Sequence, residues 1–177
     1  EKSFGGSQFD CGNSSLELPE GGFLILGWTR SFGAGQRDWY LVRVDGFGNQ
    51  QWQRTYGDAN NQSASSIIAL EDGNYLMSGG AVNGSARMIK VSPSGNVIWQ
   101  RDYSNPESFG GSNYLFKSIE LVDGRIAACG LTNNMADGDA GWLILTDANG
   151  NLQWQRKYNK NQFTDLFYHV LATEDGG

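Results

Sequence analysis

The stretch TDANGNLQWQRKY, residues 146–158, decides the fold because the chain contains it three times. Its near-copies are VDGFGNQQWQRTY, residues 44–56, and VSPSGNVIWQRDY, residues 91–103. A catalytic motif is needed once in a site, whereas a motif that recurs about every 50 residues predicts a repeated structural unit. We therefore expect the motif to build the fold and not to carry out chemistry.

A second marker recurs in parallel with the first. The turn sequences PEGG, EDGN, VDGR and EDGG begin at residues 19, 71, 122 and 174, which are 51 or 52 residues apart. Each unit contains four short segments with strand character, which in the second unit are ASSIIAL, NYLMSGG, ARMIKVS and VIWQRDY. Four antiparallel strands in a repeat of about 50 residues are typical of one blade of a β-propeller.

The prediction is therefore an all-β chain with the fold of a β-propeller of four-stranded antiparallel blades. The high content of glycine (25) and the low content of proline (3) agree with many tight turns. We expect about three complete blades and partial blades at both ends. Residues 1–177 are taken as one propeller domain or segment, with repeats at approximately 5–56, 57–103 and 104–158 and partial units at 1–4 and 159–177.

The Trp, Arg and Tyr residues of the motif alternate and therefore share one face of the fourth strand. Glycine before asparagine supplies the positive φ of a tight turn, and the preceding Asp or Ser can accept hydrogen bonds from its amides. We expect Trp52, Trp99 and Trp154 to pack between neighbouring blades, with each indole N–H bonded to a backbone acceptor. A cation–π ladder or a ligand platform is the alternative.

The quoted repeats resemble the tandem propeller repeats of secreted and surface-attached bacterial proteins. The likeness covers essentially the whole chain and is best for GWTRSFGAGQRDWYLVRVDGFGN, residues 27–49. The spacing of Asp45, Gly48 and Trp52 is also similar to the tryptophan-docking motif of the quinoprotein dehydrogenase propellers. The first resemblance implies an extracellular or cell-surface location. The second would imply an adjacent cysteine pair and a bound calcium in a redox enzyme, but this chain has no adjacent cysteines.

Charge and cysteine content exclude several classes of protein. A formal net charge of −6 with scattered basic residues argues against nucleic-acid binding. No apolar run has the length of a membrane helix. Cys11 and Cys129 lie far apart, so a disulfide is an open but disfavoured alternative to a buried, inert Cys129 thiol.

The candidate catalytic and metal-binding residues all have simpler structural explanations. His169 is the only histidine and lies in the expected first strand of a further unit. Glu71 and Asp72 belong to a recurring turn, which explains the pair without glycosidase chemistry. The oxygen-rich segment at 133–139 departs from an EF-hand loop and is expected to be a solvated loop. We predict no catalytic residues, no metal and no cofactor.

The connections differ in how much their length varies. Spans between strands one and two and between strands three and four are fixed, whereas the other two classes vary and should emerge at the opposite end. Loops on a rigid scaffold commonly bind ligands. The candidate ligand-binding residues in them are Arg30, Phe32, Arg37, Asn105, Phe109, Tyr114, Asn134 and Asp137.

The sequence thus predicts a non-catalytic extracytoplasmic recognition or scaffold module that binds a protein or a glycan through its variable loops. The alternatives are a carbohydrate-active or redox enzyme and a passive spacer of a surface assembly. Expected partners are a protein or a surface glycan, together with the remaining blades of a longer chain or further copies of this one, because open sheet edges and blade faces need covering.

Overall fold

The structure, a computed structural model, describes residues 1–81, 84–107, 111–134, 138–159 and 164–173. These residues contain twelve β-strands and no α-helix. The strands are β1 (Asp10–Glu17), β2 (Phe23–Thr29), β3 (Asp38–Val44), β4 (Gln50–Tyr56), β5 (Ser63–Ala69), β6 (Tyr75–Gly80), β7 (Ala86–Val91), β8 (Val97–Tyr103), β9 (Asn113–Glu120), β10 (Ile126–Asn134), β11 (Gly138–Thr146) and β12 (Leu152–Tyr158).

The strands form three separate sheets of four antiparallel strands each. The first sheet contains β1–β4, the second β5–β8 and the third β9–β12, and in each sheet consecutive strands are neighbours. Each sheet falls within one of the three predicted repeats. The all-β class and the four antiparallel strands per repeat are therefore confirmed.

The turn between the third and fourth strands has the predicted geometry in every sheet. Gly48, Gly95 and Gly150 have φ values of 76°, 80° and 75°, the left-handed region that favours glycine. The Asp45 carboxylate accepts hydrogen bonds from the backbone N–H and the side-chain amide of Asn49. These contacts close the turn without help from the rest of the fold, which explains why its length does not vary.

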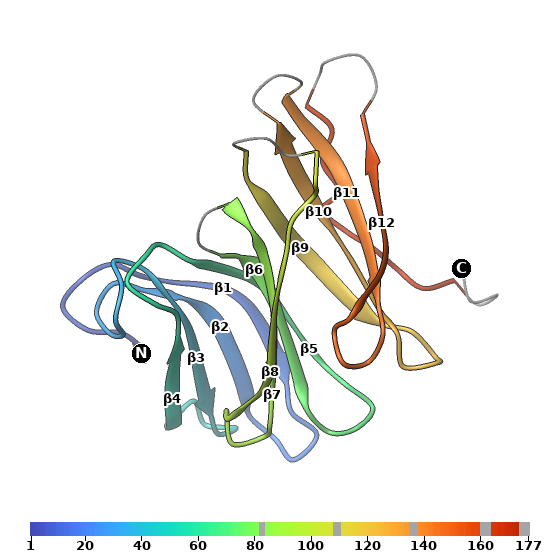
Figure 1. The fold of residues 1–177 in the computed structure, drawn as a ribbon. Helices are drawn as coiled ribbons and strands as arrows, with labels where there is room; N and C mark the ends of the chain where they lie inside the picture. The colour runs from blue at the N-terminus through green and yellow to red at the C-terminus, as the bar shows by residue number, and fades with distance from the viewer. Residues whose placement is uncertain (82–83, 108–110, 135–137, 160–163, 174–177) are drawn as a thin grey trace.

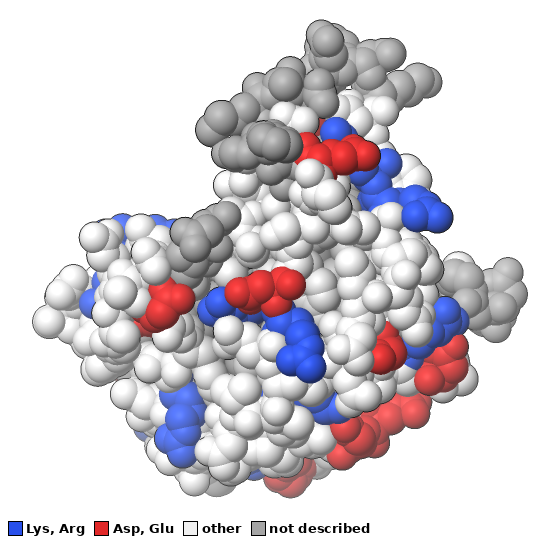
Figure 2. Space-filling view, viewed as in Figure 1, with Lys and Arg blue, Asp and Glu red and all other residues white. Residues whose placement is uncertain are grey.

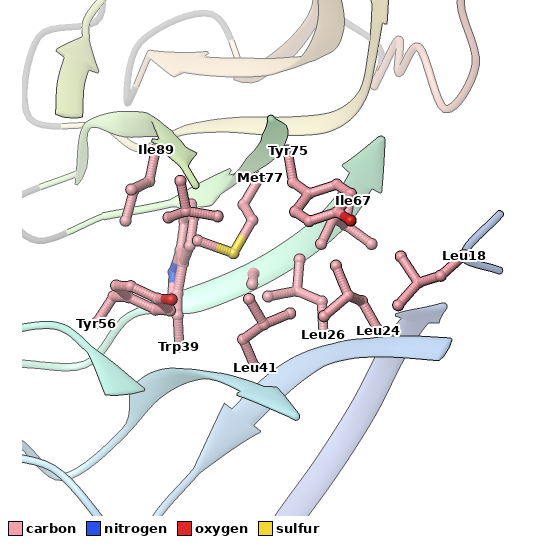
Figure 3. Packing of buried hydrophobic residues seen from close by; sticks show 12 residues of the cluster. Leu18, Leu24, Leu26, Trp39, Leu41, Tyr56, Ile67, Tyr75, Met77 and Ile89 are labelled. Atoms are coloured by element: carbon pink, nitrogen blue, oxygen red, sulfur yellow. The ribbon is translucent and has the colours of Figure 1, made fainter. Parts of the chain in front are cut away.

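The three sheets pack face to face, and the distance between them increases from their first strands outward, as Figure 1 shows. Strand β5 contacts β1, β2 and β3, and β9 contacts β5, β6 and β7. Two apolar clusters fill the two interfaces. In the first, drawn in Figure 3, Leu24, Leu26 and Leu41 of the first sheet face Ile67 and Met77 of the second. Burial of this apolar surface holds neighbouring sheets together.

The first residues of the chain lie on the outward face of the first sheet. Phe4 packs against the cluster of Tyr40, Val42 and Val44. The Lys2 ammonium donates a hydrogen bond to Asn49 Oδ1 at 2.6 Å, in the turn between β3 and β4. This segment therefore covers part of a face that no other sheet of the described chain covers.

Residues 164–173 lie on the outward face of the third sheet and form no strand, contrary to the prediction that a further first strand begins here. They nevertheless follow the path of one. The Asp165 N–H donates to the Asp139 carbonyl oxygen, as the Gln62 N–H, just before β5, donates to the Arg37 carbonyl oxygen. A strand needs a pairing partner, and the described residues provide none here. The EDGG sequence that ends the chain lies outside the described residues.

The predicted loop at 133–139 is largely a hairpin. Strand β10 continues to Asn134 and β11 begins at Gly138, and the pairing includes Asn133 with Asp139. Thr132 is buried and donates a hydrogen bond to Asn113 Oδ1, which anchors the extended strand. The expectation of a solvated loop is therefore wrong for all but residues 135–137, which lie outside the described residues.

Candidate functional site

The recurring Trp and Tyr side chains make the same contacts at both interfaces between sheets. At the first, Tyr56 Oη donates a hydrogen bond of 2.8 Å to the carbonyl oxygen of Gly95 in the next sheet. A Cβ atom placed on Gly95 would lie 3.2 Å from the Trp52 ring. The Trp ring thus rests on the glycine of the neighbouring turn, where an added Cβ would make a tight contact.

The second interface repeats this arrangement with the residues one unit further along. Tyr103 Oη donates to the Gly150 carbonyl oxygen at 2.8 Å, and a Cβ on Gly150 would lie 2.9 Å from the Trp99 ring. The prediction that Trp52 and Trp99 pack between sheets is confirmed. The expected backbone acceptor is not found for Trp99, whose buried Nε1 has no hydrogen-bond partner within the described residues. Its ring therefore contributes by packing.

The third copy of the motif is exposed, so the prediction that Trp154 packs between sheets is wrong. Trp154 is 37% exposed and Tyr158 is 47% exposed. The described chain has no further sheet to place a glycine turn over them. Among the described aromatic residues, Tyr158 contacts the ring of Phe167, with 5.3 Å between ring centroids. Arg156 lies 5.8 Å from the Trp154 ring, at the distance that Arg54 keeps from Trp52 (5.7 Å).

The variable connections gather at one end of the molecule, here called the loop end. They are the connections β2–β3, β4–β5, β6–β7, β8–β9 and β10–β11, and the short turns lie at the opposite end, at the bottom of Figure 1. Two cavities at the loop end contain predicted ligand-binding residues. The candidate site is built from these cavities.

The smaller loop-end cavity has a volume of about 230 Å³ and brings Arg37 and Tyr114 together. Its walls come from the connections of all three sheets. Tyr114 is fixed by a hydrogen bond of 2.8 Å from its hydroxyl to the Ser63 carbonyl oxygen, and its ring covers Gly80. The Arg37 guanidinium lies 4.1 Å from the centre of the Trp28 ring.

The larger loop-end cavity has a volume of about 550 Å³ and contains Asn105. It lies between the β8–β9 connection and the third sheet, with Trp142 and Lys157 in its wall. Asn105 Oδ1 accepts a hydrogen bond from the Glu107 N–H, and Asn134 Nδ2 donates to the Glu107 carbonyl oxygen. Asn105 and Asn134 thus shape the connection beside this cavity.

Two further predicted ligand-binding residues, Arg30 and Phe32, line neither cavity. Arg30 is exposed outside both of them, and Phe32 packs against Tyr40 at 5.7 Å between ring centroids. Phe109 and Asp137 lie outside the described residues. The structure therefore joins Arg37 with Tyr114, and Asn105 with Asn134, but not all of the predicted residues in one place.

Trp28 is the residue of the site that the sequence analysis missed. It stacks on Phe9 with 5.5 Å between ring centroids and 16° between ring planes, and Arg37 lies over it. A signal for it was present in the repeats. The equivalent strand positions, next after the aligned glycines, hold Gly80 and Leu131, so this tryptophan occurs once while the structural tryptophans recur.

The histidine and the two cysteines, the residues with the most reactive side chains, are not gathered in one site. His169 is exposed in residues 164–173. Cys11 and Cys129 are both free, so no disulfide joins them, and Cys129 is buried as expected. Burial raises the pKa of the Cys129 thiol to about 11. Among the described residues no group of three or more His, Cys, Asp or Glu side chains could hold a metal ion.

Charged side chains are sparse and mixed in sign on the face shown in Figure 2, with broad uncharged surface between them. Some of the basic side chains form ion pairs: Arg43 lies 2.7 Å from Glu20, and Arg87 lies 2.6 Å from Asp102. Within the described part of the chain, no helix is long and apolar enough to span a bilayer.

No model of a protein family matches this chain. A search of curated proteins also finds no match. The inference of function therefore rests on the repeats and on the geometry of the loop end.

Proposed function

We propose that the three sheets are consecutive blades of a β-propeller and that the protein is a non-catalytic recognition or scaffold module. It binds a protein or a surface glycan through the loop end, outside the cytoplasm of a bacterium. The resemblance of the repeats supports the location. The observation that carries the proposal is the contrast between two kinds of residue: the Trp and Tyr residues that hold the sheets together recur, whereas Arg37 and Tyr114, which line the smaller loop-end cavity, do not recur at the aligned positions.

The repeated contact supports the propeller. In two successive interfaces a Trp ring rests on the glycine of the next turn and a Tyr hydroxyl donates to that glycine's carbonyl oxygen. The same operation relates the first sheet to the second and the second to the third. Repetition of one such operation about an axis is the construction principle of a propeller.

The loop end supports recognition. A scaffold whose sheets are held by one repeated contact can vary its connecting loops without loss of stability. Here the loop-end walls contain aromatic rings, amides and a guanidinium, which are side chains suited to anchoring and orienting a polar partner. Concave sites with a few placed polar groups are the usual form of ligand-binding sites.

The experiment compares bulky substitutions at the two ends of the intact chain. A glycan array and a pull-down from bacterial surface extract first identify the partner. Asn61→Trp and Ser112→Trp then block the loop end at exposed residues, and Phe47→Trp and Val122→Trp are matched controls at the turn end.

The loop-end variants should weaken capture about tenfold, equivalent to about 1.4 kcal/mol, without a change in thermal stability. The turn-end variants should bind like the parent protein. If only the turn-end variants lose the partner, recognition is at the wrong end. If neither pair of variants loses the partner, or if no partner is captured at all, the recognition proposal fails.

A further inference from the structure

The smaller loop-end cavity contains a positive charge without a counter-ion. Among the described residues Arg37 has no ion pair, whereas Arg43, Arg87, Lys90 and Arg125 each lie within 2.7 Å of a carboxylate oxygen. Arg37 Nε is buried and has no hydrogen-bond partner in the described chain. A partly buried guanidinium without an acceptor is costly, and a bound anion would offset that cost.

The orientation of this guanidinium is set before any ligand arrives. The guanidinium carbon, Cζ, lies over the Trp28 ring at 4.1 Å from its centre, and Trp28 itself stacks on Phe9. A contact of this kind restrains the guanidinium and uses none of its N–H donors. A planar edge of two N–H donors matches the two oxygens of a carboxylate.

Tyr114, another lining residue, is also held in place and is chemically different from Arg37. The Tyr114 ring lies over Gly80, where a Cβ atom would come within 2.2 Å of it, and its hydroxyl is held by the Ser63 carbonyl oxygen. Asn61 and Ser112, which carry an amide and a hydroxyl group, are also among the lining residues. Such a lining suits a ring with several hydroxyl groups.

The volume of the cavity and the absence of Arg37 from the other repeats limit the class of ligand further. A volume of about 230 Å³ is below the range of about 300–1,000 Å³ that holds drug-sized ligands, so one ring-sized group is the fitting occupant. At the aligned positions the second and third sheets have Gly84 and Asp139 in place of Arg37. The Arg–Trp pair is therefore no requirement of the repeated fold.

We infer that this cavity binds the carboxylate-bearing sugar unit of an acidic glycan. Arg37 receives the carboxylate along its edge, and the Tyr114 side of the cavity accommodates the sugar ring. This inference rests on the proposed function, since it assigns a ligand class to the same loop end.

The test is a titration of the intact, isotope-labelled chain, followed by NMR through the Trp28 indole and Arg37 Nε–H signals. The probes are glucuronate, glucose as its neutral counterpart, and N-acetylglycine as a carboxylate without a sugar ring. Glucuronate should shift these signals saturably and bind about tenfold or more tightly than either other probe, as expected for a charge-assisted contact combined with a ring-sized fit.

The matched variants are Arg37→Gln and Arg30→Gln. Arg37→Gln should weaken glucuronate binding about tenfold, because it removes the charge and the planar edge. Arg30 is exposed outside the cavity, so Arg30→Gln should bind glucuronate like the parent chain.

Three results would overturn the inference. If glucose binds as tightly as glucuronate, the carboxylate is not recognised. If N-acetylglycine binds as tightly as glucuronate, the sugar ring is not recognised. If both Arg variants lose binding equally, the ligand does not bind in this cavity. If glucuronate does not bind but the loop-end Trp variants still lose their partner, this ligand class is wrong and the proposed function stands. If those Trp variants keep their partner, the proposed function itself fails.

Discussion

The Trp-x-Arg-x-Tyr motif has two different environments in this protein. In the first two sheets its Tyr is 8% and 5% exposed and donates to a glycine carbonyl oxygen of the following sheet. In the third sheet the same side chain is 47% exposed. The sequence of the three copies is nearly identical, so the difference comes from the neighbour. The motif is a docking element whose contribution to stability depends on a glycine turn that lies 39 or 47 residues further along the chain.

The largest expected difference is between the docked and exposed tryptophans. Trp52→Ala or Trp99→Ala should lower the free energy of unfolding by about 2–4 kcal/mol, because each leaves a gap above a turn glycine. Trp154→Ala should cost less than about 1 kcal/mol, since its ring is partly in solvent. Urea unfolding of the three single variants measures the difference. Equal losses at all three positions would mean that docking on the next sheet does not determine the contribution.

The turn glycines offer a test in which backbone strain is matched. Gly48 and Gly150 have almost the same φ, 76° and 75°, so Ala is strained at both. An added Cβ meets the Trp99 ring at 2.9 Å at Gly150, but only Lys2 Cγ at 3.9 Å at Gly48. Both variants should pay about 1 kcal/mol for the strain, and Gly150→Ala should lose about 1–3 kcal/mol more through overpacking.

Thermal or urea melts of Gly48→Ala and Gly150→Ala give that additional loss directly. A Gly150→Ala protein as stable as Gly48→Ala would show that the ring can move aside, and that the close contact is not required.

The smallest expected difference concerns the tyrosine hydroxyls. Tyr103→Phe leaves the buried Gly150 carbonyl oxygen without its donor and should cost about 1–2 kcal/mol at neutral pH. Tyr158→Phe should be near neutral, because no glycine carbonyl of a described residue receives its hydroxyl. Measurement of both variants by urea unfolding isolates the hydroxyl from the ring.

The pH dependence sharpens the same comparison. Burial raises the pKa of Tyr56 and Tyr103 above the usual value of 10.0. A tyrosine whose pKa rises on folding stabilises the fold fully below its unfolded pKa, and this contribution is lost as pH rises toward the folded pKa. Stability should therefore fall above about pH 10, and less steeply in Tyr103→Phe. A parallel decline in both proteins would contradict the assignment.

Much of the fold could be predicted because its determinants are local. Glycine turns such as the one at Gly48 and the alternation of each strand are written in consecutive residues, and repetition identifies them. The exposure of Trp154 could not be predicted in this way, because it depends on whether another sheet follows. The hairpin at Asn133 and Asp139 was also missed, because polar residues on strands extended beyond the core resemble a loop.

The candidate site was predictable only in part. Loop lengths predicted that Arg37 and Tyr114 lie at the same end of the molecule, and these two line one cavity. The stacking of Trp28 under Arg37 depends on the pairing of β2 with β3, and Phe32 packs inward against Tyr40. The composition of a loop does not indicate which of its side chains will pack against the neighbouring sheet.

The path of residues 164–173 has a consequence for the entropy of assembling the chain. These residues attach to the outward face of the third sheet through hydrogen bonds from the Asp165 and Phe167 amides. They do so although no further strand of the described chain pairs with them. Attachment of one segment is thus separable from formation of a sheet around it. A short segment that returns to the sheet from which it has just emerged costs little loop-closure entropy, because the closed loop is short.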